Sequence, residues 1–270
     1  MIMKTMQRLI LAILALTVPL APAYAKHHVK PEAKTENYHY LMPRDVADAA
    51  RSLAKPPGTG SKAWKKDIQD IIGLQAAPSP DEIAAARDEN RLQPELVTHV
   101  LAEDFTRDNL PVTFALLDQT GVDAKDATGV AKKYWKQPRP FKTSKKVKLM
   151  LDEPKDYAYP SGHTSTSYVW AMILTDLQPD AAAPLTQKAE SIAGHRTLAG
   201  VHSSHDIDAG REFGKQLLKL FYKDSRFLNQ LESARREIAA LGCAKERALD
   251  IPPVWARRPA FLFSPLVRPH

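Results

Sequence analysis

Two histidines with distinctive neighbours are the residues of this chain most suited to chemistry. His202 precedes Asp206 by four residues, a spacing that puts both side chains on one face of a helix. The carboxylate could then hydrogen-bond one ring nitrogen and leave the other free to act as a nucleophile. His163 follows Ser161 and Gly162 at the start of a segment that continues into an apolar run. A lone histidine–aspartate pair is usually an ordinary surface pair, so the interpretation depends on what surrounds it.

Groups that bind anions accompany both histidines. The helix predicted to start after Ser161 exposes backbone amides, and its dipole strengthens their attraction for anions. Lys132 and Arg139 are seven residues apart, or two helical turns, although Pro138 indicates that the helix bends or ends between them. Cations, an anion-binding helix start and a carboxylate-oriented histidine together predict a phosphate-handling site with its own nucleophile.

A turn is needed to bring a further cation, Arg196, to this site. Arg196 lies six residues before His202, so on an unbroken helix the two side chains would point in different directions. Gly200, between them, is a poor helix former. We therefore expect a helix, a short turn near Gly200 and a second helix.

These stretches together resemble the signature of the type 2 phosphatidic-acid phosphatase superfamily, which vanadium haloperoxidases share. The signature has three parts, K-x6-R-P, P-S-G-H and S-R-x5-H-x3-D, and three motifs in this order are highly specific. Within the superfamily the chain is most similar to the class A bacterial non-specific acid phosphatases, from about Pro56 to about Leu241. The matching residues are Lys132, Arg139, Pro140, Pro160, Ser161, Gly162, His163, Arg196, His202 and Asp206.

The resemblance implies a single-domain, all-α helical bundle of the acid phosphatase/vanadium-dependent haloperoxidase type. It also implies hydrolysis of phosphate monoesters with broad specificity through a phosphohistidine, with no metal or other cofactor. In that scheme His202 attacks phosphorus, Asp206 orients it, and His163 protonates the leaving alkoxide and then activates water. The groups expected to bind the substrate phosphate are Lys132, Arg139, Ser161, Gly162, Arg196 and His195.

One position departs from the signature, because His195 replaces the family's serine before the arginine. An imidazole can also donate a hydrogen bond to an anion, but it is larger than a hydroxyl and it titrates. The side chain could line the anion site or face solvent, and the sequence leaves both possibilities open.

The rest of the chain has helical patterns separated by Gly and Pro, with no useful β-alternation, and this also favours an all-α fold. Ser79 and Glu82 have the types and spacing of a capping box, with Pro80 at the first helical position. Pro94 is expected to open a helix that runs through Leu101. The other expected helical or apolar segments are 45–55, 64–74, 112–117, 122–135, 181–198, 205–222 and 225–241.

The two ends differ in composition from the body of the chain. Residues 1–25 have the positive start, apolar core and Ala-Tyr-Ala ending of a secretory signal peptide, which predicts a periplasmic protein. Residues 26–43 are expected to form a flexible arm, 44–242 the helical phosphatase domain, and 243–270 a Pro/Arg-rich tail. No later apolar run is long enough to predict a transmembrane helix. Cys243 is the single cysteine, so no intramolecular disulfide can form.

The formal net charge of +7 raises the alternative of nucleic-acid binding, through the lysines of residues 142–148. No aromatic residues are interleaved with these lysines, and an exported protein meets little nucleic acid. A loop that attracts anionic substrates is the better interpretation. The expected partners are therefore small phosphorylated substrates, with no nucleic acid, no stable membrane insertion and a dimer as the favoured oligomer.

Other functions stay open for the same residues. Vanadate held by His202 would make a vanadium-dependent haloperoxidase, and the same site could serve a phosphotransferase or a lipid-phosphate phosphatase. A protein that captures phosphate without turnover is a further alternative. The presence of a nucleophile, an orienting carboxylate and an acid favours turnover, and the class A resemblance favours hydrolysis over halide oxidation.

Overall fold

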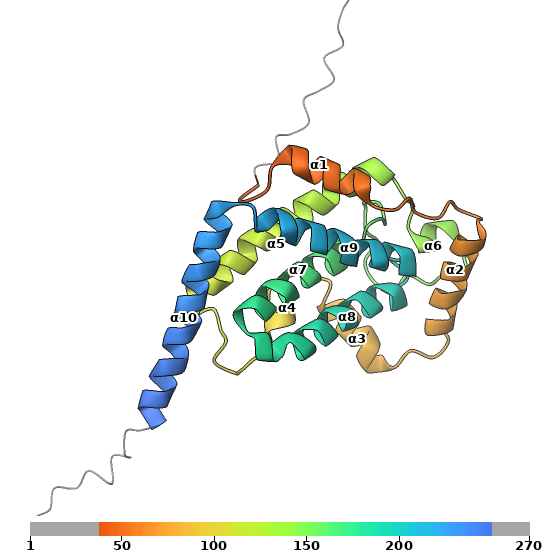
Figure 1. Cartoon of the computed structure of the whole chain (residues 1–270). Helices are drawn as coiled ribbons and strands as arrows, with labels where there is room; N and C mark the ends of the chain where they lie inside the picture. The colour runs from red at the N-terminus through yellow and green to blue at the C-terminus, as the bar shows by residue number, and fades with distance from the viewer. Residues whose placement is uncertain (1–37, 250–270) are drawn as a thin grey trace, which may run out of the picture. The chain divides into compact units, whose positions relative to one another are not determined.

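The structure, a computed structural model, describes residues 38–249, with side chains as far as residue 242. This part of the chain forms helices and no strand, so the prediction of an all-α fold is confirmed (Figure 1). The expected signal peptide, the arm as far as residue 37 and the tail from residue 250 lie outside the described residues. The helices are α1 (Pro43–Ser52), α2 (Lys62–Leu74), α3 (Pro80–Asp88), α4 (Glu95–Thr98), α5 (Pro111–Trp135), α6 (Pro140–Thr143), α7 (Gly162–Leu177), the 3₁₀ turn η1 (Pro179–Ala181), α8 (Ala182–Leu198), α9 (Ser204–Phe221) and α10 (Ser225–Leu249).

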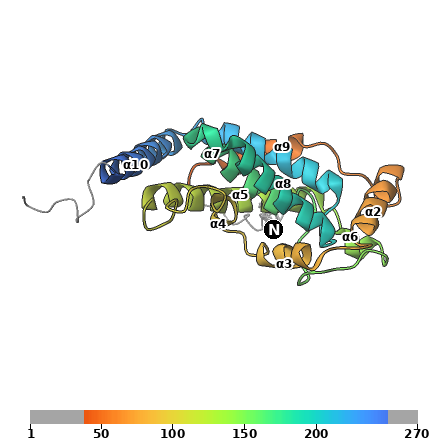
Figure 2. The same cartoon turned by 90° about the horizontal axis from the view of Figure 1, so that it is seen from below.

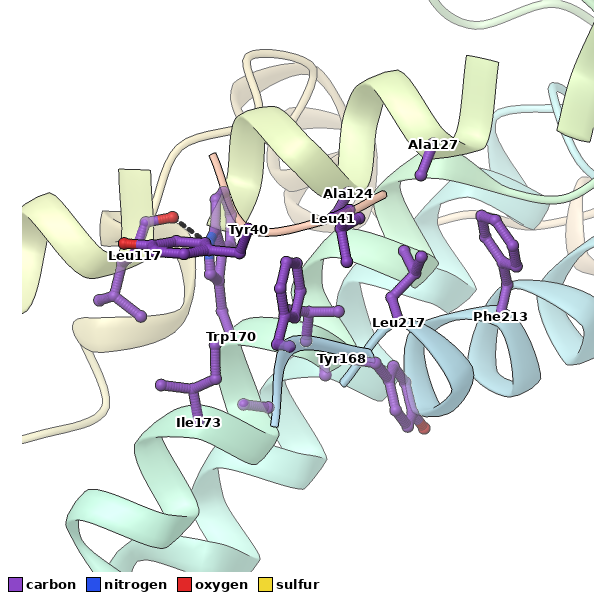
Figure 3. Packing of buried hydrophobic residues seen from close by; sticks show 14 of the residues in the cluster. Tyr40, Leu41, Leu117, Ala124, Ala127, Tyr168, Trp170, Ile173, Phe213 and Leu217 are labelled. Carbon is purple, nitrogen blue, oxygen red and sulfur yellow. Dashed lines mark hydrogen bonds between the residues drawn. The ribbon is translucent and has the colours of Figure 1, made fainter. Parts of the chain in front are cut away.

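Helix α7 is the centre of the packing. Most of its residues are buried, as expected of a helix that is surrounded on all sides. It packs against α5, α8 and α9, while α1 and α10 pack on α5 (Figures 1 and 2). Trp170 of α7 reaches α5, where its Nε1 donates to the main-chain oxygen of Leu117 over 2.7 Å (Figure 3). Helix α7, which carries His163 in its first turn, is therefore held by the core. Within the described residues no helix has the length and apolar character needed to cross a membrane.

Helix α5 is continuous over 25 residues, where the sequence suggested separate segments at 112–117 and 122–135. Leu117, Ala124 and Ala131 are all buried. Their spacing of seven residues is two helical turns, so one apolar face continues across the supposed gap. The core contact decides the length of this helix.

Two local predictions had different outcomes. The capping box of Ser79 and Glu82 is confirmed, since both of its reciprocal hydrogen bonds are present at the start of α3. The helix expected from Pro94 through Leu101 is wrong in length, because α4 ends at Thr98. The N–H of Leu101 donates to the main-chain oxygen of Thr98, which makes a turn rather than a further helical turn.

The last residues of the predicted flexible arm belong to the folded domain. Tyr40 and Leu41 are each 4 % exposed and pack in the core (Figure 3). The carboxylate of Asp123 on α5 accepts hydrogen bonds from the backbone N–H groups of His39 and Tyr40. Apolar burial and these hydrogen bonds hold the segment in place. At the other end, α10 continues past the expected boundary at residue 242.

Helix α9 passes close to the start of α7 at Gly210. A Cβ on Gly210 would lie 2.8 Å from Cβ of Thr164 and 2.9 Å from the main-chain oxygen of Ser161. The N–H of Ser161 donates to the main-chain oxygen of Asp206 over 2.9 Å. This contact joins the chain that follows His202 to the chain that precedes His163.

Gly210→Ala should therefore destabilise the fold by about 1–3 kcal/mol, the usual cost of overpacking. Urea unfolding measures this loss of stability. Gly194→Ala on α8 is the matched control, because no described residue outside the adjoining turns of α8 lies within 4 Å of its added Cβ. Alanine in a helix is favoured over glycine by about 0.5–1 kcal/mol, so this control should be more stable than the wild type. Similar losses of stability in both variants would contradict the close contact between α9 and α7 at Gly210.

Candidate active site

Residues far apart in the sequence line one cavity of about 950 Å³. They come from the last turns of α5, the segment before α6, the first turn of α7, the end of α8 and the turn before α9. The structure therefore brings both predicted histidines and the predicted cations to a single site. These residues are Lys132, Arg139, His163, Arg196 and His202.

The turn after α8 places Arg196 and His202 in the same cavity. Gly200 has a φ of 75°, in the left-handed region that favours glycine, so the predicted break at this position is confirmed. A Cβ on Gly200 would also lie 2.4 Å from the main-chain oxygen of Lys148. The N–H groups of Val201 and His202 each donate to the main-chain oxygen of Arg196 over 3.3 Å. The chain thus folds back on the end of α8.

The ring nitrogens of the buried His202 have different surroundings. Nε2 lies 3.2 Å from Nη1 of Arg139. Because a guanidinium only donates, Nε2 is the accepting nitrogen and the hydrogen of the neutral ring is on Nδ1. Among the residues that the structure describes, Nδ1 has no hydrogen-bond partner, and Oδ2 of Asp206 is 3.6 Å away. The hydrogen bond predicted between His202 and Asp206 is therefore not formed in this structure, although the two groups are close.

The predicted helix face shared by His202 and Asp206 is wrong, because His202 lies before α9 rather than on it. Ser203 is the N-cap of α9. Its N–H donates to Oδ2 of Asp206 over 2.7 Å, and its side chain accepts from the N–H of Asp206. The capping interaction therefore fixes the carboxylate of Asp206 beside the ring of His202.

Burial and nearby cations keep His202 neutral. Burial lowers the pKa of His202 well below its usual value, and the charges of Arg139 and Lys132 lower it further. Burial also raises the pKa of Asp206 to about 6, against the opposing effect of its hydrogen bonds with Ser203. A neutral imidazole with its lone pair beside cations is the form that can act as a nucleophile on a bound anion.

His163 is held by main-chain oxygens. Its Nε2 lies 3.1 Å from the oxygen of Glu89 and 3.3 Å from that of Asn90. Carbonyl oxygens only accept, so Nε2 carries the hydrogen. Burial lowers the pKa of His163 to about 4, and the charge of Arg196 contributes in the same direction. A phosphate dianion beside the ring would offset that charge and favour the protonated form that a general acid needs.

The lowered pKa of His163 predicts a pH-dependent effect on stability. Unfolded His163 takes up a proton near pH 6.5, whereas the folded residue does so only near pH 4. The stability it contributes is therefore complete above pH 6.5 and is lost as the pH falls toward 4. His163→Asn removes this loss. When the pH is lowered from about 7.5 to about 4.5, the free energy of unfolding of the variant should rise relative to that of the wild type by up to about 2 kcal/mol. Urea unfolding of both proteins at the two pH values measures the gain, and a difference that does not change with pH would contradict it.

Arg196 has unused hydrogen-bond donors in the cavity wall. The residue is 1 % exposed, and its Nε and Nη1 have no hydrogen-bond partner within residues 38–249, while Nη2 donates to the main-chain oxygen of Ala86. Buried donors without partners are costly, and in a cavity wall they are suited to binding an anion. Gly162, at the N-terminus of α7, also lines the cavity and adds a helix dipole that favours anions.

Asp156, which the sequence did not single out, bridges two of the cations. Its Oδ2 lies 2.6 Å from Nζ of Lys132, and its Oδ1 lies 2.5 Å from Nη2 of Arg139. Burial by itself would raise the pKa of Asp156, but Lys132 and Arg139 hold it below its usual value. Burial and Arg139 lower the pKa of Lys132 to about 8, and Asp156 opposes them. The carboxylate thus makes the contacts that a phosphate would make. No spacing rule marks Asp156, which lies in a loop.

Two side chains predicted to bind phosphate do not line the cavity. Ser161 is the N-cap of α7, and its buried Oγ accepts hydrogen bonds from the N–H and the hydroxyl of Thr164, at 3.4 and 2.9 Å. The Nδ1 of His195 lies 2.8 Å from Oε2 of Glu89. Sequence reasoning missed Glu89 because it lies 106 residues from His195, with no periodicity that connects them.

A second histidine–carboxylate pair lies outside the cavity lining. Nδ1 of His205 is 2.7 Å from Oδ2 of Asp67 on α2. In the part of the chain that the structure describes, no group of three or more His, Cys, Asp or Glu side chains is arranged to hold a metal ion.

The chain is similar to known proteins over the part that contains the cavity. Residues 112–229 match the PAP2 superfamily, a span that includes Lys132, His163 and His202. An acid phosphatase of Zymomonas mobilis is 27 % identical over 219 residues, which are 78 % of this chain and 81 % of that protein. A non-specific acid phosphatase of Salmonella typhi is 26 % identical over 210 residues, 74 % of this chain and 83 % of that protein. Another from Providencia stuartii is 26 % identical over 216 residues, 75 % of this chain and 86 % of that protein.

Proposed function

We propose that this chain, which belongs to the PAP2 superfamily, is an acid phosphatase that hydrolyses a broad range of phosphate monoesters through a phosphohistidine. The observation that supports this best is that the two histidines His163 and His202 line the same cavity as the cationic side chains of Lys132, Arg139 and Arg196. A nucleophile, a proton donor and charge neutralisation are the requirements of phosphoryl transfer to a side chain.

In the proposed complex the phosphate dianion lies among Lys132, Arg139 and Arg196, which neutralise its non-bridging oxygens. Nε and Nη1 of Arg196 supply donors that have no other partner among the described residues. The N-terminus of α7 at Gly162 adds its amides and dipole. Binding requires Asp156 to release Lys132 and Arg139.

The first step transfers the phosphoryl group to the protein. Nε2 of His202 forms a bond to phosphorus while the bond between phosphorus and the ester oxygen breaks. His163 gives a proton to the departing alkoxide, which leaves as an alcohol. The ring of His202 becomes an imidazolium, and its Nδ1–H approaches Asp206, 3.6 Å away before the reaction. The carboxylate stabilises the new positive charge.

The second step releases phosphate. A water molecule attacks phosphorus as the bond from phosphorus to Nε2 of His202 breaks, and His163 accepts the proton of the water. Inorganic phosphate leaves, and both histidines return to their initial protonation states.

The proposal needs no metal ion, because Lys132, Arg139 and Arg196 provide the charge neutralisation that a divalent cation provides in other phosphatases. It includes export to the periplasm, which is supported by the signal-peptide pattern of residues 1–25.

A substrate panel tests the reaction class and the metal independence together. The purified protein is assayed with p-nitrophenyl phosphate, an alkyl phosphate and a sugar phosphate across the acid and neutral pH range, with and without EDTA. We expect phosphate release from all three, unchanged by EDTA. Loss of activity in EDTA would contradict metal independence. Halide oxidation with added vanadate, without phosphate release, would indicate a peroxidase.

Asp156→Asn should bind inorganic phosphate more tightly than the wild type, because the carboxylate competes for Lys132 and Arg139. Partly exposed ion pairs are each worth about 0.2–1 kcal/mol, so the competitive inhibition constant of phosphate should fall roughly fivefold. The assay is run at mildly acid pH, where Lys132 stays charged.

The matched control for Asp156 is Glu153→Gln. Glu153 lies in the same loop, 3.0 Å from Nζ of Lys142, and it does not line the cavity. The inhibition constant of phosphate for Glu153→Gln should stay at the wild-type value. Weaker phosphate binding by Asp156→Asn would show that Asp156 supports the two cations rather than competing for them.

A further inference from the structure

Glu89 contacts basic residues across a helix–helix contact beside the cavity. It is the C-cap of α3 and is 2 % exposed. Its Oε1 lies 2.8 Å from Nζ of Lys188, and its Oε2 lies 2.8 Å from Nδ1 of His195 and 3.7 Å from Nη2 of Arg196. All three partners belong to α8, which packs on α3. This cluster therefore sets how the end of α3 meets the end of α8.

The main chain at Glu89 makes a second connection to the cavity. The main-chain oxygens of Glu89 and Asn90 accept from Nε2 of His163, at 3.1 and 3.3 Å. The side chain of Glu89 itself does not line the cavity, whereas His163 and Arg196 do. Glu89 thus contacts His163, the proposed acid, through its backbone. Its side chain contacts Arg196, which is proposed to bind phosphate.

The carboxylate of Glu89 is ionised although it is buried. Burial alone would raise the pKa of Glu89, but hydrogen bonds with His195 and Lys188 hold it below its usual value. Its negative charge attracts Nη2 of Arg196, while Nε and Nη1 of the same guanidinium have no partner in the part of the chain that the structure describes. Nη2 also donates to the main-chain oxygen of Ala86, so this hydrogen bond and the charge at Glu89 together hold Arg196 in the orientation that leaves these two donors for a ligand.

We propose that Glu89 is a positioning residue for the phosphatase site, and that His195 and Lys188 hold its carboxylate where it orients Arg196. This inference rests on the proposed function. His195, at the position of the family's serine, acts on Glu89 rather than on the substrate phosphate. Glu89 contacts neither the substrate nor the reacting atoms.

Glu89→Gln tests the proposal, because it keeps the size of the side chain and removes its charge. Isothermal titration with inorganic phosphate should show a dissociation constant at least fivefold higher than that of the wild type. KM for p-nitrophenyl phosphate should rise by a similar factor, and kcat should change less. The matched control is Glu190→Gln on α8, the helix that carries the partners of Glu89; Glu190 pairs with Arg211 at 2.5 Å and does not line the cavity. Its dissociation constant and KM should match the wild type.

Variants of His195 provide an independent measurement. His195→Gln can still donate a hydrogen bond to Glu89 and should bind phosphate within twofold of the wild type, whereas His195→Ala should bind several-fold more weakly. If Glu89→Gln fails to fold, the two His195 variants test the proposal instead. Equal phosphate affinities in these two variants overturn it. A lower melting temperature of Glu89→Gln with unchanged phosphate affinity and KM makes Glu89 only structural and also overturns it. A wild type that binds phosphate but hydrolyses no ester refutes the proposed function, and the titrations still decide whether Glu89 positions Arg196.

Discussion

His202→Ala protein is expected to be inactive on every phosphate monoester and to retain no phosphate after mixing with substrate. The substitution removes Nε2, the nitrogen that accepts from Arg139 inside the cavity. The loss should be roughly 10⁴- to 10⁶-fold in kcat, the range typical of removing a catalytic nucleophile.

Rapid mixing with phosphorus-labelled substrate measures this directly. Label on the wild-type protein should survive an alkaline quench and be lost in acid, as expected of a phosphorus–nitrogen bond. His205→Ala is the control, because His205 pairs with Asp67 and does not line the cavity. It should keep both the label and most of the activity. Full activity of His202→Ala in EDTA would refute the assignment of the nucleophile.

His163→Asn should lose activity in proportion to the basicity of the leaving group. A general acid contributes about 10²- to 10⁴-fold, and a loss of this size is expected with alkyl phosphates, whose alkoxides need a proton to leave. p-Nitrophenolate leaves without one, so the first step with p-nitrophenyl phosphate should slow by less than about tenfold. Single-turnover release of p-nitrophenol and of alkyl alcohol compares the two.

The affinity of His163→Asn for inorganic phosphate distinguishes loss of the acid from loss of the site. The cations Lys132, Arg139 and Arg196 remain, so phosphate should bind within a few-fold of the wild-type affinity. Equal losses with both leaving groups, or loss of phosphate binding, would mean that His163 is structural.

The geometry of the site comes from the places where helices end rather than from helix faces. His163 lies in the first turn of α7, Arg196 near the end of α8, and His202 in the turn before α9. The first N–H groups of a helix have no hydrogen-bond partner within the helix, and the helix dipole is positive at this end. The N-terminus of α7 is suited to binding an anion for this reason. The close approach of α9 to α7 brings these ends together.

The amino-acid sequence by itself determined the features that depend on neighbours within a few residues. Helical periodicity indicated an all-α fold, the capping box at Ser79 was placed correctly, and the break at Gly200 was found where the backbone turns. Local rules succeed here because helix periodicity, caps and glycine turns act over one or two helical turns. The signature motifs also selected His163 and His202, which line the cavity.

Only the tertiary structure decided which groups meet. Asp156 lies against Lys132, and Glu89 pairs with His195. The physical reason is that burial and ion pairing depend on segments distant in sequence. The same α3–α8 contact that buries Glu89 supplies the cations that keep it charged, and no local pattern encodes such a contact.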